Sequence, residues 1–122
     1  MPDRASSPTL GVLLISDGLE RAHYAFVLAT AAAAIGRDVT LFATNAGCHA
    51  LLAVLPYGGP HAPGVATLAE LRDAAGAIGV RLLACPAGLR LAGLEAAPLA
   101  PGVTVAGVPS FLAASPGQVI TL

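Results

Sequence analysis

The amino-acid sequence predicts an α/β fold, a three-layer α/β/α sandwich around a mostly parallel sheet of about five strands. Short apolar runs alternate along the chain with longer segments of helical character. The first of these runs is apolar throughout, as in a parallel strand that is covered on both faces. Residues that begin and end helices stand between the runs, which supports the same alternation.

The expected strands are short, apolar and rich in β-branched residues, and they cover 10–15, 38–43, 80–84, 103–106 and 118–122. The expected helices lie between them and cover 19–35, 46–55, 67–76, 86–92 and 108–114. Every strand except the last is followed by at least one helix. This order is typical of a parallel sheet with helices on both faces.

The first helix has the clearest boundary signals. Ser16 and Asp17 precede it and are residue types that cap helices, and Glu20 in the first turn suits the helix dipole. Gly36 stands at the position where glycine commonly ends a helix. The segment between is apolar on nearly all sides, so we expect it to lie between the sheet and a partner subunit.

The middle of the chain carries two further helix starts and a loop. Thr44 and Asn45 are expected to cap the second helix, and Thr67 with Glu70 three residues later forms a capping-box pattern. Segment 56–64 is rich in proline and glycine, which predicts a surface loop.

The composition favours one oligomeric domain. The 122 residues are 56% hydrophobic and only 11% charged, and all six basic residues are arginine. So few charges leave apolar surface that a homo-oligomer would bury. The net charge of −1 gives no sign of nucleic-acid binding.

We expect residues 1–9 to form a flexible arm without a signal-peptide pattern, and residues 10–122 to form the single domain. The longest apolar helical stretch, 25–35, is shorter than the roughly 20 residues of a membrane span. These features predict a cytoplasmic protein without membrane insertion. Its two cysteines are then expected to be thiols.

Cys85 is the strongest candidate for a reactive residue. It follows the third strand and precedes Pro86, a residue favoured in the first turn of a helix, so Cys85 is expected at the N-cap. Unpaired backbone N–H groups and the helix dipole at that position favour a thiolate. The alternative is a cysteine that packs as a small apolar residue at the end of a strand.

The turns after the first three strands should meet at one edge of a parallel sheet, where ligands bind in such folds. They supply Asp17 and Cys48 as accessory candidates beside Cys85. His23, one turn into the first helix, is a candidate proton partner for the thiol. Each has a plainer alternative: a helix cap for Asp17, a packed helix cysteine for Cys48 and a surface or interface histidine for His23. The backbone of the expected pocket comes from Gly18, Asn45, Ala87 and Gly88.

Several kinds of site are not supported. His23, His49, His61 and the cysteines lack metal-ligand spacing, so we expect no metal. The glycines form neither a dinucleotide-binding nor a Walker-type pattern, and no cofactor is expected. Cys-x-x-Cys and Gly-x-Ser-x-Gly motifs are also absent from the sequence.

Longer segments resemble a known family. Segment 16–25 reads Ser-Asp-Gly-Leu-Glu-Arg-Ala-His-Tyr-Ala, and 33–42 reads Ala-Ala-Ile-Gly-Arg-Asp-Val-Thr-Leu-Phe. Segment 84–94 reads Ala-Cys-Pro-Ala-Gly-Leu-Arg-Leu-Ala-Gly-Leu, a cysteine followed by a small-residue turn and a short helix. Their order and spacing resemble the DsrE/DsrF-like family, which includes sulfur-relay proteins of the DsrE/TusD type. The chain departs from the family pattern at 45–49 and 57–64.

The resemblance implies a DsrEFH-like α/β subunit that assembles into dimers, trimers or hexamers. Family members with the cysteine, which matches Cys85, are sulfur carriers or sulfurtransferase components that work with donor and acceptor proteins. The leading hypothesis is therefore a sulfur-relay protein that carries sulfane sulfur as a persulfide on Cys85. Alternatives are a non-catalytic oligomeric small-ligand-binding or scaffold subunit with an inert cysteine, and a thiol redox sensor that pairs Cys48 with Cys85.

Overall fold

The computed structural model describes residues 8–58 and 62–122. Its sheet contains β1 (Leu10–Leu14), β2 (Val39–Ala43), β3 (Arg81–Ala84), β4 (Val103–Val105) and β5 (Gln118–Thr121). The strand order is β4-β3-β2-β1-β5, and all neighbouring strands are parallel. Each predicted strand is confirmed to within one residue at either end.

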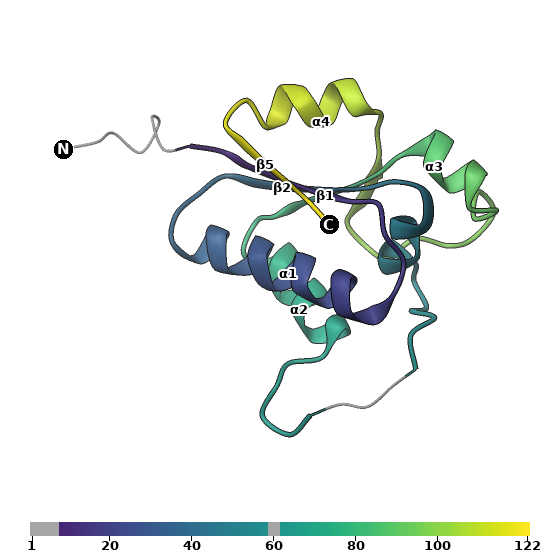
Figure 1. The fold of residues 1–122 in the computed structure, drawn as a ribbon, viewed down its shortest axis with the longest axis horizontal. Helices are drawn as coiled ribbons and strands as arrows, with labels where there is room; N and C mark the ends of the chain where they lie inside the picture. Colours follow the sequence, from purple (N-terminus) through teal and green to yellow (C-terminus); the bar gives the residue numbers. More distant parts are fainter. Residues whose placement is uncertain (1–7, 59–61) are drawn as a thin grey trace.

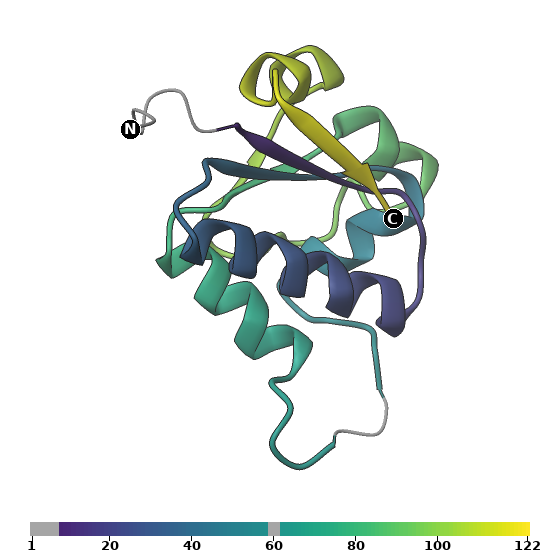
Figure 2. The same ribbon diagram turned by 60° about the vertical axis from the view of Figure 1, so that its left-hand side comes forward.

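The helices form the other two layers of the sandwich. Helices α1 (Leu19–Ala34) and α2 (Leu68–Ala77) cover one face of the sheet, and α4 (Val108–Ala114) covers the other (Figure 1). Helix α3 (Pro86–Leu91) and the 3₁₀ helix η2 (Asn45–Leu51) lie where the strands end. The rotated view in Figure 2 shows the same separation of α4 from the α1 and α2 layer. The predicted three-layer α/β fold is confirmed.

The predicted helix over 46–55 is replaced by the shorter η2. The backbone becomes extended at Leu52, which forms an antiparallel bridge with Leu99, and the Ala53 N–H donates to the carbonyl oxygen of Pro98 at 2.8 Å. Buried Arg72 of α2 then donates to the carbonyl oxygens of Ala50 and Leu52 at 3.0 and 2.7 Å. These tertiary partners end the helix before its expected boundary.

The predicted carboxyl-terminal end of α1 agrees with the structure, but the predicted amino-terminal cap does not. Gly36 has a φ of 94°, its N–H donates to Ala33, and the next N–H donates to Ala32, as in a Schellman motif. The expected Ser16 or Asp17 cap was wrong. The N-cap residue is Gly18, with a φ of 104° and no side-chain cap, and Asp17 Oδ1 instead accepts the Gly18 N–H at 2.8 Å.

The other capping predictions had mixed outcomes. The capping box of α2 is confirmed, since Thr67 Oγ1 accepts the Glu70 N–H and the Glu70 carboxylate accepts the Thr67 N–H. Thr44 does occupy the N-cap of η2, but its side chain makes no cap hydrogen bond there. Its hydroxyl donates to Asn45 Oδ1 at 3.1 Å instead.

Apolar side chains form two clusters, one on each face of the sheet. The larger cluster lies under α1, whose buried residues are mostly small: Ala22, Ala25, Phe26, Ala29 and Ala32. The smaller cluster lies under α4 and consists of Phe42, Phe111 and Cys85. The rings of Phe42 and Phe111 stack with centroids 5.0 Å apart. Cys85 therefore packs in a different apolar cluster from the main core.

The amino-terminal residues join the sheet at one edge. Residues 1–7 of the expected arm lie outside the described residues, as do 59–61 of the expected loop. The Thr9 carbonyl oxygen accepts the Gln118 N–H at 3.0 Å, and Arg37 donates to the Pro8 and Thr9 carbonyls at 3.3 Å. In the described part of the chain, no helix is both long and apolar enough to span a membrane.

Two glycine substitutions test how closely η2 is seated on β1. A Cβ added to Gly47 would overlap the carbonyl oxygen of Leu14, whereas one on Gly76 of α2 meets nothing within 4 Å. Gly47→Ala is expected to lower the free energy of unfolding by about 2 kcal/mol or more, because a backbone must move. Gly76→Ala, the matched control, should raise it by about 0.5–1 kcal/mol through helix propensity. Denaturant titration of both variants measures this, and equal stabilities would contradict it.

Candidate functional site

The turns after β1, β2 and β3 lie side by side at the carboxyl edge of the sheet, as expected. The Thr44 N–H donates to the Leu14 carbonyl oxygen at 3.0 Å, and the Gly47 N–H donates to that of Ile15 at 2.9 Å. The Cys85 N–H donates to the Ala43 carbonyl oxygen at 2.9 Å. Backbone hydrogen bonds therefore fix the three segments to one another.

Cys85 is the N-cap residue of α3, with Pro86 in the first turn, as the sequence predicts. Its Sγ accepts the N–H of Gly88 at 3.4 Å. Gly88 packs directly against Thr44 and Asn45, which it can do because it has no Cβ; a Cβ at this position would overlap both residues. The sulfur also packs in the cluster of Phe42 and Phe111, so Cys85 is only 7% exposed.

Cys48 lies in the main core and is fully buried. Its Sγ donates to the carbonyl oxygen of Ala43 at 3.6 Å, and this oxygen also accepts the Cys85 N–H. Burial, with a smaller contribution from charge on Cys85, raises the pKa of the Cys48 thiol to about 11. Both cysteines are free, and they pack in separate clusters. The geometry favours a packed helix cysteine at position 48.

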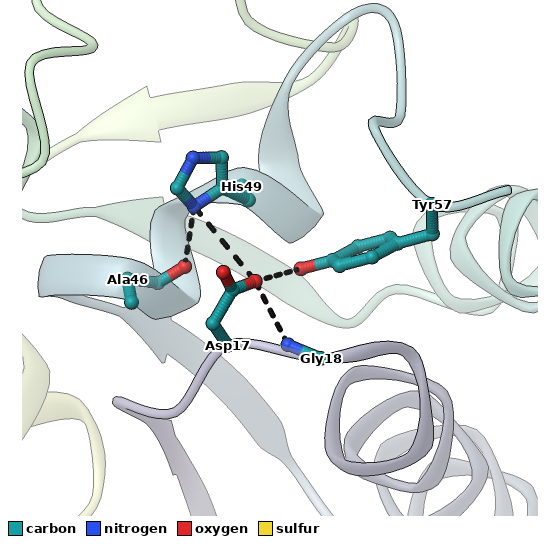
Figure 3. Close-up of polar contacts among 5 residues, drawn as sticks. All are labelled: Asp17, Gly18, Ala46, His49 and Tyr57. Carbon is teal, nitrogen blue, oxygen red and sulfur yellow. Dashed lines mark hydrogen bonds and ion pairs between the residues drawn. The ribbon is translucent and has the colours of Figure 1, made fainter.

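Asp17 is the centre of a polar cluster that Figure 3 shows, which we call the Asp17 cluster: Asp17, His49 and Tyr57. Asp17 Oδ1 accepts the Tyr57 hydroxyl at 3.3 Å and lies 3.9 Å from His49 Nδ1. His49 Nδ1 is 2.8 Å from the Ala46 carbonyl oxygen, so it must carry the hydrogen. Asp17 follows β1, His49 lies in η2, and Tyr57 lies in the loop after η2.

Two of these residues were missed by the sequence reasoning. His49 follows the second strand by six residues and shares an edge with Asp17, which was a usable signal. Tyr57 lies in the proline- and glycine-rich loop, and no spacing pattern links it to Asp17. Only the folded path of that loop brings the hydroxyl to the carboxylate.

The Asp17 cluster alters the titration of Tyr57. Burial, followed by the negative charge of Asp17, raises the pKa of Tyr57 from 10.0 to about 12. The folded chain holds this proton more tightly than the unfolded chain. The contribution of Tyr57 to the free energy of unfolding is therefore fully present below pH 10. It is lost as the pH rises through about 12.

The remaining predicted site residues divide between separate places. Asn45 has a φ of 52°, a left-handed conformation uncommon for a residue with a side chain, and it lies against Gly88 beside Cys85. Ala87 is exposed in the first turn of α3. Gly18 is next to Asp17, and its N–H donates to the Asp17 carboxylate. His23 Nε2 is 2.8 Å from the Ala66 carbonyl oxygen, so its ring faces the segment before α2.

A metal centre finds no support in the side chains. Among residues 8–58 and 62–122, no group of three or more histidine, cysteine, aspartate or glutamate side chains could hold a metal ion. The carboxyl edge carries the Cys85 thiol and the Asp17 cluster.

Replacing Asp17 with Asn tests the electrostatic part of this arrangement. It is expected to lower the pKa of Tyr57 from about 12 while leaving it above 10.0, because burial remains when the charge is removed. Phenolate absorbance during a pH titration measures this in a Tyr24→Phe background, which leaves Tyr57 as the sole tyrosine. Glu95→Gln on the same background is the control. An unchanged Tyr57 pKa in the Asp17→Asn protein would contradict the cluster.

Comparison with known proteins places this fold in a family. The model of the DsrE/DsrF-like family matches residues 11–116. A crystal structure of the ychN protein from E. coli is similar, with a TM-score of 0.75 at 15% sequence identity, and the match covers 95% of this chain and 100% of that one. A search of curated proteins gives no match. Since the family model spans most of the sequence, the chain belongs to the DsrE/DsrF-like family.

Proposed function

We propose that this protein is a sulfur carrier, which holds sulfane sulfur as a persulfide on Cys85 and transfers it to a partner protein. The observation that carries the proposal is the position of Cys85 at the N-cap of α3, with the Gly88 N–H directed at its sulfur at 3.4 Å. Membership of the DsrE/DsrF-like family, which at the family level suggests sulfur relay, supports it.

The transfer needs two thiol exchange steps. The Cys85 thiolate attacks the outer sulfur of a donor persulfide, R–S–SH, and the S–S bond of the donor breaks. Cys85 Sγ is then bonded to the transferred sulfur as a persulfide, Cys85–S–SH, and the donor leaves as the thiolate R–S⁻. An acceptor thiolate attacks the same outer sulfur and regenerates the Cys85 thiolate. Each step moves one sulfur atom without a net change of oxidation state, so no cofactor is required.

The surroundings of Cys85 suit a sulfur that must be protected between transfers. The Gly88 N–H can donate to the negatively charged sulfur, as N-cap donors do. The neighbouring rings of Phe42 and Phe111 keep water from one side of the group. Cys48 is a poor second nucleophile because burial raises the pKa of its thiol to about 11.

The proposal includes a homo-oligomer, a dimer, trimer or hexamer, in a reducing cytoplasmic setting. Exposed apolar side chains support assembly, among them Leu91, Val108 and Leu112, which are 76%, 46% and 55% exposed. Two free cysteines suit a reducing compartment. Donor and acceptor are proteins that present a persulfide and a thiol.

A second candidate function is a non-catalytic ligand-binding or scaffold subunit in which Cys85 is inert. The observation that favours it is the burial of the cysteine, which is only 7% exposed beside two phenylalanine rings. A buried thiol in apolar surroundings behaves as a small apolar side chain.

Treatment with glutathione persulfide followed by intact-mass measurement tests the relay. The wild-type protein is expected to gain the mass of one sulfur atom, and to lose it on addition of an acceptor thiol. Cys85→Ser should gain none, whereas Cys48→Ser should behave as wild type because Cys48 is buried and protonated. The relay is ruled out if wild type gains no sulfur, or if Cys85→Ser gains it equally.

Alkylation separates the two candidate functions independently of any donor. In a Cys48→Ala protein, where Cys85 is the remaining cysteine, iodoacetamide should modify Cys85 in the folded protein near neutral pH. The matched Cys85→Ala protein should react far more slowly. A Cys85 that stays unmodified until the protein is denatured would instead support the inert subunit.

A further inference from the structure

Two adjoining cavities lie where α1 and α2 begin, and Cys85 lines neither of them. One has a volume of about 280 Å³ and is lined by residues of α1, of the segment before α2 and of the start of α2. The other, of about 240 Å³, extends toward Leu55 and Tyr57. Both are lined by Leu19, Thr67 and Leu68, so they share a wall.

The walls of these cavities are largely apolar and include two aromatic rings. Leu19 and Leu68 contribute to both, and Val65 contributes to the larger one. Tyr24 lines the larger cavity and Tyr57 the smaller. Apolar walls with a few polar groups are the usual character of small-molecule sites, and tyrosine faces attract organic cations.

The polar groups that line the cavities are mainly hydrogen-bond acceptors. Glu20, the acidic residue in the first turn of α1, lines the larger cavity. His23 donates its Nε2 hydrogen to the Ala66 carbonyl oxygen, which leaves Nδ1 as an acceptor in the neutral ring. Tyr57 of the smaller cavity donates its hydroxyl hydrogen to Asp17, which lines neither cavity, so the Tyr57 oxygen retains only acceptor capacity.

The described residues that line the two cavities include neither lysine nor arginine. The whole chain has no lysine. Arg21 follows Glu20 on α1 but does not line them. Glu20 is the acidic residue among these described lining residues, so its charge complements a cationic ligand rather than an anionic one.

We propose that these cavities bind a small organic cation, a primary amine carried on a compact apolar body. The ammonium group would be held near Glu20 in the larger cavity, and the apolar body would pack on Leu19 and Leu68. The combined space suits a molecule of the size of one ring with a short chain. The proposal does not depend on sulfur chemistry, because Cys85 lines neither cavity.

Phenethylamine is the probe, and its binding to the ¹⁵N-labelled full chain is followed by amide chemical shifts. Saturable shifts are expected at Leu19, Glu20 and 65–68, with affinity that falls as salt is added. The anion 3-phenylpropanoate and the neutral 2-phenylethanol have the same ring and should bind about tenfold more weakly or not at all. Cys85→Ser should bind phenethylamine as wild type does.

Charge variants complete the test. Glu20→Gln should weaken phenethylamine about tenfold, whereas Glu95→Gln, which removes an exposed carboxylate paired with Arg90 on α3, should leave affinity unchanged. Circular dichroism establishes that both variants are folded. The proposal is overturned if phenethylamine gives no saturable shifts, if the anion or the alcohol binds equally well, or if Glu20→Gln and Glu95→Gln have the same affinity.

Discussion

The close seating of η2 over the ends of β1 and β3 is the constraint on which the carboxyl edge depends. Gly47 allows the turn to rest on the Leu14 carbonyl, and Gly88 allows α3 to rest on Thr44 and Asn45. Any larger side chain at either position would separate the segments. Because both contacts involve backbone atoms, the position of Cys85 relative to β2 is set by the main chain. The left-handed Asn45 is part of the same close fit.

The two cysteines have different surroundings, although the segments that carry them lie side by side at the carboxyl edge of the sheet. The Ala43 carbonyl oxygen accepts from the backbone of Cys85 and from the thiol of Cys48, yet the side chains pack in different clusters. Cys48 belongs to the large core under α1, where a charged sulfur would be poorly solvated. Cys85 lies under the small α4 layer and has an N–H donor of its own. This asymmetry is the physical basis for assigning chemistry to one thiol and packing to the other.

The strands and most helices could be predicted because local patterns and tertiary structure agree for them. The buried β1 and β2 are apolar at nearly every position, and Pro86 and Gly36 mark helix ends by restrictions on their own backbones. The helix over 46–55 could not be predicted correctly, since Leu52, Leu99 and Arg72 shorten it from a distance. The Asp17 cluster depends in the same way on the path of the loop that carries Tyr57. Interactions between distant segments leave no periodic signal in a single sequence.

Helix α4, close to the end of the chain, completes the surroundings of Cys85. Phe111 of α4 stacks on Phe42 and covers the sulfur of Cys85, while β5 pairs with the edge of β1. Local opening of α4 alone would expose Cys85, whereas β5 would stay in place, because Ile120 and Leu122 pack against the core that contains Cys48. Exposure of each thiol therefore marks a different opening reaction. Exposure of Cys85 marks local opening of the α4 layer, and exposure of Cys48 marks disruption of the main core.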